Sequence, residues 1–194
     1  MLIVIEGLDG SGKSTVSKIL ATKLNANLLT TPGTDFKDTR KRLDTIFNNN
    51  PKARQLFYMA TVLNVSDDAQ ALIASGQHVV VDRYWLSTQV YHCWMTNGQH
   101  YLLHEIESEL LKPDLTVYLD LPLDERIKRI SNRNNCTCED RQTLTQKADA
   151  ELRGLYESMC DDKPVGKWIV IDASQDISVI VDTILNNAMR LSNL

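Results

Sequence analysis

The stretch LIVIEGLDGSGKST, residues 2–15, decides the fold of this chain. Its first four residues are an unbroken apolar run with β-branched members, which is typical of a strand buried in a parallel sheet. The pattern Gly7-x4-Gly12-Lys13-Ser14 follows at once and matches a phosphate-binding loop. Apolar residues then recur at positions 16, 19, 20 and 24, a helical spacing. We therefore expect a strand, a phosphate-binding loop and a helix in that order.

This loop predicts a site for a nucleoside triphosphate. Its glycines allow backbone N–H groups to approach phosphate oxygens, and the new helix directs its positive end at the same place. Lys13 brings a charge for the β- and γ-phosphates, and the Ser14 hydroxyl suits Mg²⁺. The expected ATP-binding residues in this stretch are Gly7, Gly10, Ser11, Gly12, Lys13, Ser14 and Thr15.

Two acids, Glu6 and Asp9, flank the loop. Carboxylates beside a triphosphate would repel it unless they hold a metal or meet a second ligand. Asp9 lies inside the loop, where it can face a second substrate. The alternative is that its side chain closes the loop by accepting a bond from a backbone N–H.

Length and composition indicate an ordinary globular protein. The 194 residues suit one domain, 1–194, and 21 basic against 25 acidic residues argue against nucleic-acid binding. No apolar run is long enough to cross a membrane, and Met1 leads directly into the first strand, so we expect no membrane span and no signal peptide. The four cysteines form neither a disulfide framework nor a zinc pattern. We expect a cytoplasmic protein.

A second group of candidate residues follows the apolar run 79–81. Asp82 ends this expected strand, and an acid at the carboxyl end of such a strand faces the ligand crevice, so Asp82 is a candidate for a second Mg²⁺ contact. The guanidinium of Arg83 can hold two phosphates, although a salt-bridged helix start is the alternative. The helix expected next is rich in aromatic residues, which suits either a stacked base or ordinary packing.

Arginines also gather near the segment 131–141. A helix is expected from about residue 124, and its polar face carries Arg126, Lys128 and Arg129. The segment itself is polar and aperiodic, and Arg129, Arg133 and Arg141 lie in or beside it. A closing loop that supplies arginines suits phosphoryl transfer, and a solvated connector is the alternative. Arg40, which follows the turn at 31–34, is a further candidate phosphate ligand.

Strands and helices alternate along the chain, with strands expected at 2–5, 27–30, 77–82, 115–120 and 167–172. This alternation predicts an α/β fold in which helices cover both faces of a parallel sheet. Right-handed crossovers bring all carboxyl ends of the strands to one edge. The loop at Gly7, Asp82, the segment 131–141 and the turn at Ser174 then converge there, which is the layout of a small-molecule kinase.

Five stretches together resemble the thymidylate kinase family of P-loop nucleoside monophosphate kinases. They are IEGLDGSGKST, VVDRYWLSTQVY, KPDLTVYLDLP, the segment ending in EDR, and VIDAS. The resemblance implies a three-layer sandwich with strand order 2-3-1-4-5 and a lid at about 131–141. It also implies ATP- and Mg²⁺-dependent phosphorylation of a pyrimidine nucleoside monophosphate, foremost dTMP to dTDP, and a homodimer.

The resemblance also implies roles for individual residues. Lys13 would hold the donor phosphates, Ser14 and Asp82 the Mg²⁺, and Arg83 the acceptor phosphate. Gly10 stands where some relatives carry a loop arginine, so the lid would supply the catalytic arginines. The acceptor would contact Asp9, Ser87, Thr88 and Tyr91; the lid arginines would be Arg129, Arg133 and Arg141; and Ser174 and Gln175 would lie near the adenine.

Two departures from the family pattern favour an alternative acceptor. The stretch Thr30-Thr31-Pro32-Gly33 lacks the arginine that the family carries there, and Arg40 is its candidate replacement. Ser66 stands where our ungapped alignment expects the arginine that holds thymine. The segment 55–58, Trp85 and the stretch 110–115 resemble the mitochondrial-type UMP-CMP kinase branch of the family, so CMP or UMP, or their deoxy forms, are the alternative acceptors. A nucleoside acceptor and a non-catalytic nucleotide-binding module are two further alternatives.

Overall fold

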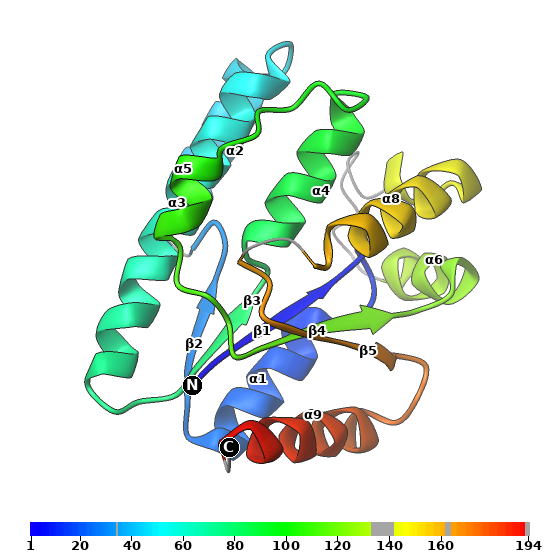
Figure 1. Cartoon of the computed structure of the whole chain (residues 1–194). Coiled ribbons are helices and arrows are strands. Elements are labelled where there is room, and N and C mark those ends of the chain that lie inside the picture. Colours follow the sequence, from blue (N-terminus) through cyan, green and yellow to red (C-terminus); the bar gives the residue numbers. More distant parts are fainter. Residues whose placement is uncertain (34, 133–141, 162–163, 193–194) are drawn as a thin grey trace.

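The computed structural model describes residues 1–33, 35–132, 142–161 and 164–192. Strands and helices alternate along the chain as the sequence predicts (Figure 1). The strands are β1 (Leu2–Gly7), β2 (Asn27–Thr30), β3 (Val79–Asp82), β4 (Leu115–Asp120) and β5 (Lys167–Asp172). The helices are α1 (Lys13–Leu24), α2 (Lys37–Ile46), α3 (Pro51–Ala74), α4 (Trp85–Met95), α5 (His104–Glu109), α6 (Leu123–Ser131), α8 (Gln146–Met159) and α9 (Ile177–Ser192).

The strands form one parallel sheet in the order β2-β3-β1-β4-β5, which confirms the predicted order. In the register, Ile5 lies beside Asp82 and Gly7 lies beside Leu119. At the same carboxyl ends, Asp120 of β4 lies beside Asp172 of β5. Because all strands are parallel, their carboxyl ends share one edge of the sheet, and the phosphate-binding loop begins at its centre.

Helices cover both faces of the sheet, so the apolar run of β1 is buried on both sides. Leu2 and Val4 belong to the cluster under α3, α4 and α8. Ile3 and Ile5 alternate with them and belong to the cluster under α1 and α9. Figure 1 shows these two layers above and below the sheet. Packing on both faces explains why this strand shows no polar alternation.

The structure refines some predicted boundaries. Strand β1 extends to Gly7, beyond the expected 2–5, and strand β3 begins at Val79 instead of residue 77. Helix α3 begins at Pro51, a residue type favoured at the first helical position, and the Asn50 side chain accepts a bond from the N–H of Ala53. Among the described residues, no helix has the length and apolar content needed to cross a membrane.

Candidate functional site

The loop between β1 and α1 presents free backbone donors. Gly10 and Gly12 have φ of 88° and 101°, conformations that side-chain-bearing residues rarely adopt. Among the described residues, the N–H groups of Gly10, Gly12, Lys13 and Ser14 donate to no protein acceptor. Gly12 is the N-cap of α1, and Lys13 and Ser14 are its first two residues, so these N–H groups lie at the positive end of the helix dipole. The loop therefore presents, at the predicted place, the donors and the positive helix end that an anion site requires.

Lys13 is buried at this loop, with 5% of its surface exposed. Its Nζ donates to the carbonyl oxygen of Leu8 at 2.8 Å. Burial, together with the charge of Arg83, lowers the pKa of Lys13 to about 7, while the carboxylates of Asp9, Asp82 and Glu6 oppose this shift. An ammonium held in a site of low polarity interacts strongly with a phosphate that enters it.

Asp9 joins the loop to the residues that follow β3. Its carboxylate is paired with the guanidinium of Arg83 and accepts a bond from the Tyr91 hydroxyl at 2.9 Å. Arg83 also lies over the Tyr91 ring, 5.5 Å from its centroid. Burial alone would raise the pKa of Asp9, but the charges of Arg83 and Lys13 lower it to about 2. Three predicted acceptor residues thus form one cluster beside the loop.

Ser14 and Asp82 form an oxygen-rich pair at the start of α1. The Ser14 hydroxyl donates to Asp82 Oδ2 at 2.6 Å, and the buried Asp82 Oδ1 has no protein partner in the described residues. A hydroxyl and a carboxylate are hard oxygen ligands of the kind that Mg²⁺ prefers. This donor set, beside the phosphate cradle, fits the predicted metal.

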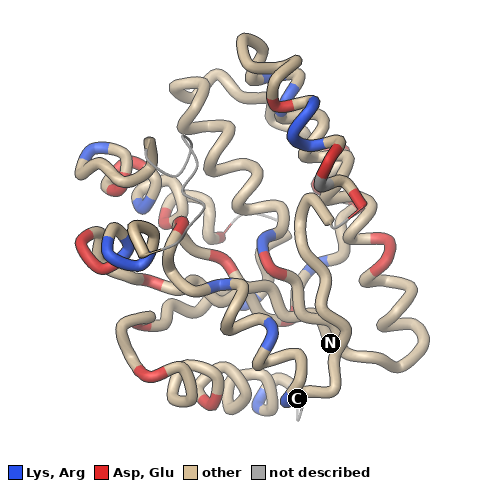
Figure 2. The backbone as a smooth tube through the Cα atoms, turned by 180° about the vertical axis from the view of Figure 1, so that it is seen from behind, with Lys and Arg blue, Asp and Glu red and all other residues tan. Residues whose placement is uncertain are grey.

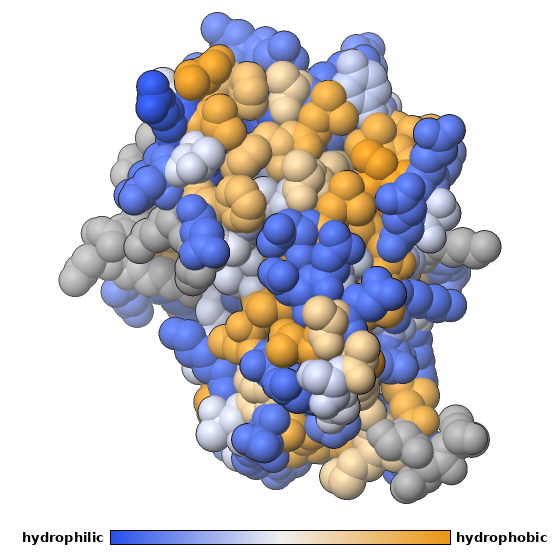
Figure 3. Space-filling view, turned by 90° about the vertical axis from the view of Figure 1, so that its left-hand side faces the viewer, coloured by the Kyte–Doolittle hydropathy of each residue, from blue (hydrophilic) through white to orange (hydrophobic). Residues whose placement is uncertain are grey.

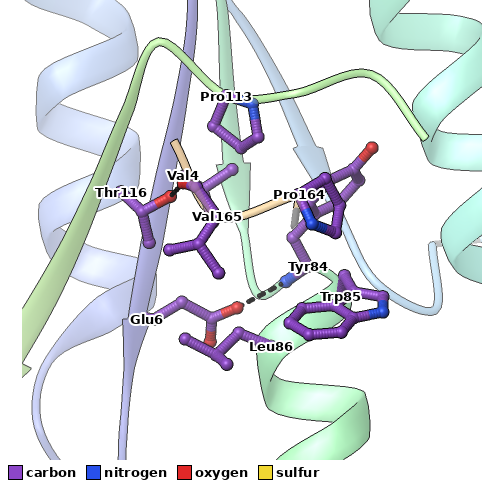
Figure 4. A pocket seen from close by; sticks show the side chains of 9 residues that line it. All are labelled: Val4, Glu6, Tyr84, Trp85, Leu86, Pro113, Thr116, Pro164 and Val165. Atoms are coloured by element: carbon purple, nitrogen blue, oxygen red, sulfur yellow. Dashed lines mark hydrogen bonds between the residues drawn. The ribbon is translucent and has the colours of Figure 1, made fainter. Parts of the chain in front are cut away.

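Glu6 has a role that the sequence did not indicate, because it faces the core instead of a ligand. It is fully buried, and burial raises its pKa. Its carboxylate accepts a bond from the N–H of Tyr84 at 3.0 Å (Figure 4). It also accepts bonds from the N–H of Ser87 at 3.2 Å and from the Ser87 hydroxyl. It therefore fixes the turn that carries Arg83, whose φ of 67° costs about 1 to 3 kcal/mol.

The cavity drawn in Figure 4 is not a nucleotide site. It is lined by Glu6 and mainly apolar side chains, including Val4, Leu86 and Val165. Its volume of about 10 Å³ admits no more than a water molecule.

Ser87 and Thr88 lie on α4, one turn before Tyr91, and both are buried. The hydroxyl of Ser87 bonds to Glu6 and lies 3.1 Å from the Tyr156 hydroxyl, while that of Thr88 reaches the Tyr84 carbonyl at 3.5 Å. Both hydroxyls therefore already bond within the protein. The structure brings these two residues near the cluster without direct contact to Asp9.

Arg129 links the loop to the turn after β5. Its guanidinium donates to the carbonyl oxygen of Ser11 at 3.3 Å and to that of Ala173 at 2.9 Å. Ser174 follows Ala173 at once, and its hydroxyl donates to Asp172 at 2.6 Å. The predicted donor-side residues, with Gln175 next in the chain, thus lie on the same edge as the loop. Arg133 and Arg141 fall outside the described residues.

Arg40 belongs to a separate group between α2 and α3. It contacts Asp44 at 3.4 Å and lies 6.0 Å from the centroid of the Tyr58 ring. That ring is 5.5 Å from the ring of His92 on α4. Ser66 lies elsewhere on α3, where its hydroxyl accepts the N–H of Leu111 at 2.8 Å. These contacts of Arg40 and Ser66, within the described part of the chain, lie outside the Asp9 cluster.

Two arginines near the site have partners that the sequence does not indicate. Arg126, expected on a polar helix face, is fully buried and is paired with Asp149. Arg153 on α8 is paired with Asp149 and Asp120. Arg126 and Asp149 are 23 residues apart and Arg153 and Asp120 are 33 residues apart, so no local pattern signals these two pairs, whereas Asp149 and Arg153 stand at the i, i+4 spacing of one helix.

Comparisons with known proteins agree with this geometry. A family model described as Thymidylate kinase matches residues 5–184. The chain is 35% identical to a probable thymidylate kinase of Methanococcus maripaludis, over 95% of this chain and 92% of that protein. It is 27% identical to a thymidylate kinase of Blochmanniella pennsylvanica, over 92% of this chain and 90% of the other.

Solved structures share the fold. A thymidylate kinase from Candida albicans superposes with a TM-score of 0.73 at 25% identity, covering 99% of this chain and 92% of the other. A deoxyadenosine kinase from M. mycoides gives a TM-score of 0.65 at 21% identity, covering 97% and 99%. At that lower identity, the second likeness concerns the fold alone.

Proposed function

Because the chain belongs to the thymidylate kinase family, we propose that it transfers the γ-phosphoryl group of ATP to dTMP, giving dTDP and ADP. Residues 1–194 then act as one kinase domain. The observation that carries this proposal is the pairing of Asp9 with Arg83. It places a cation suited to the acceptor phosphate beside the loop that suits the donor phosphates.

The donor half of the site follows from the loop geometry. The free N–H groups of Gly10, Gly12 and Ser14 bind phosphate oxygens, and Lys13 neutralises charge on the β- and γ-phosphates. Ser14 and Asp82 would hold Mg²⁺, which neutralises phosphate charge when bound. These groups are fixed before substrate arrives, so they stabilise the transition state without reorganisation.

The acceptor half supplies position and charge. Arg83 binds the monophosphate and holds one of its oxygens in line with the γ-phosphorus. That oxygen forms a bond to phosphorus while the bond to the β–γ bridging oxygen breaks, and ADP leaves. A phosphate dianion is already a nucleophile, so no general base is required. Asp9 and Tyr91 hold Arg83 in place and lie where they can meet the sugar.

An assay of ADP release with Mg·ATP tests the proposed function. We expect dTMP to give the largest kcat/KM among dTMP, dUMP, UMP, CMP and dCMP, and we expect EDTA to abolish turnover. Dominant turnover of CMP or UMP would contradict thymine recognition and support the alternative acceptors. Faster turnover of thymidine than of dTMP would identify a nucleoside kinase. If no acceptor caused ADP release, the result would support a nucleotide-binding module without kinase activity.

The same proposal includes a homodimer formed through α3 and the chain before α5. Leu56 is 46% exposed and Leu102 is 67% exposed. They lie on neighbouring segments, because the Gln55 side chain bonds to the backbone of Tyr101 in both directions. Figure 3 shows apolar side chains gathered on this face of the molecule.

Sedimentation equilibrium tests the homodimer. We expect twice the chain mass of 22.0 kDa for the wild type, and the mass of one chain for Leu56→Glu combined with Leu102→Glu. Val170→Glu, on exposed strand β5, is the matched control and should leave the dimer intact. A monomeric wild type at micromolar concentration would contradict the proposal.

A further inference from the structure

Helix α6 places a buried guanidinium directly behind the phosphate-binding loop. We propose that Arg126 is a positioning residue for ATP, because it fixes the orientation of the peptide between Asp9 and Gly10. The residue has no exposed surface, and an arginine is almost never fully buried unless it is paired, so its partners account for its place in the core. Neither the transfer chemistry nor the metal site proposed above requires it.

The guanidinium spans three parts of the chain. Its Nε donates to the carbonyl oxygen of Asp9 at 2.7 Å. On the other side, it is paired with the carboxylate of Asp149 on α8, and its Nη2 lies 3.5 Å from the carbonyl oxygen of Thr143. The forked geometry of an arginine allows these contacts at once, whereas an ammonium is a single point donor.

The contact to Asp9 controls a donor of the cradle. The Asp9 carbonyl and the Gly10 N–H belong to one planar peptide unit, in which they point in opposite directions. The Gly10 N–H has no acceptor among the described residues. Because Arg126 holds the carbonyl on the α6 side, the N–H is directed away from α6. Arg126 thus orients one donor of the cradle without touching the ligand.

Packing keeps this arrangement tight. A Cβ on Gly10 would lie 3.1 Å from the backbone oxygen of Arg126 and 3.1 Å from the side chain of Ile130. The loop therefore rests directly on α6. A flip of the Asp9–Gly10 peptide would leave the buried Nε of Arg126 without its acceptor, which is costly.

Arg126 is in turn anchored to the end of the sheet. Asp149 also accepts a bond from Arg153 at 2.8 Å, and Arg153 is paired with Asp120 at the end of β4. Figure 2 shows α6 and α8 side by side, with basic and acidic positions on both. Arg153 shares the network and the partner Asp149 but makes no contact with the loop in the described structure, so it is a matched control.

The test compares Arg126→Met with Arg153→Met, using whichever acceptor turns over fastest. We expect Arg126→Met to lower kcat/KM for ATP by about 10- to 100-fold, the effect of losing a charge-assisted hydrogen bond. The KM for the acceptor should stay near wild type. Arg153→Met should leave the ATP parameters near wild type, although both variants lower the unfolding temperature. Asp149 keeps one arginine partner in either variant, so the comparison is balanced.

A second variant separates positioning from stability. Arg126→Lys keeps the charge, but one ammonium does not replace the fork, so its Kd for MgATP should rise about tenfold while the fold is retained. Calorimetry gives this Kd without any acceptor, so the result is independent of the proposed substrate. Wild-type MgATP affinity in Arg126→Lys, equal losses in the two Met variants, or a change confined to the acceptor KM would each overturn the inference.

Discussion

Replacing Lys13 with methionine will lower kcat by about 10³-fold, because a buried cation at the transferring phosphates stabilises the charge of the transition state. Methionine keeps the apolar stem and removes only the ammonium, whose Nζ lies 2.8 Å from the Leu8 carbonyl. Burial lowers the pKa of Lys13 to about 7, so the folded protein disfavours its charge. We therefore expect no fall in the unfolding temperature of this variant, measured by circular dichroism.

The matched control is Lys18→Met, five residues further on α1, where the side chain is exposed. It should retain wild-type turnover. Full activity of Lys13→Met with an intact fold would remove the basis for phosphoryl transfer at this loop. A loss that is equal in both variants would indicate a nonspecific effect of charge on α1.

Replacing Arg83 with alanine will lower kcat/KM for the monophosphate by about 10³-fold or more, the scale at which transition-state arginines act. The KM for Mg·ATP should change little, because the donor cradle is built from the loop itself. The reason for the large effect is the placement of Arg83 against Asp9 and beside Tyr91. Steady-state kinetics with each substrate varied in turn measures both parameters.

Arg40→Ala is the informative comparison, because Arg40 is the other candidate for the acceptor phosphate. It is half-exposed and already contacts Asp44. We expect it to retain most of the acceptor kcat/KM. A large acceptor defect in Arg40→Ala and a small one in Arg83→Ala would reassign the phosphate contact. An Arg83→Ala variant with unchanged acceptor KM would favour a nucleoside as the acceptor.

Much of the fold follows from local sequence. The strands at 27–30, 115–120 and 167–172 are where the apolar runs predict them, and the order of the sheet agrees with the family resemblance. The phosphate-binding loop and Asp82 also lie at the predicted edge. These features depend on apolar periodicity and on glycine, which act over a few residues.

The charged interior does not follow from local sequence. The sequence predicts that Glu6 is an acid near a ligand. In the structure its carboxylate instead accepts hydrogen bonds from the N–H groups of Tyr84 and Ser87, 78 and 81 residues away. The sequence predicts Arg126 on the polar face of a helix. In the structure it is buried, because Asp149 and the carbonyl oxygen of Asp9 accept its hydrogen bonds. The burial of a charge depends on partners that only the folded chain brings together. The spacing of apolar residues predicts which face of an element is buried, but it does not predict ion pairs between residues far apart in the sequence.

Glu6 has a consequence for how the site becomes ordered. The first residues of α4 have no capping side chain of their own; Tyr84 precedes the helix and Ser87 is its third residue. The Glu6 carboxylate accepts hydrogen bonds from the N–H groups of both. This strand residue therefore caps the helix N-terminus from a distant part of the same chain. Helix nucleation is costly without such help. The helix that carries Tyr91 is therefore capped only once β1 is in place, and the donor and acceptor halves of the site fold as one cooperative unit.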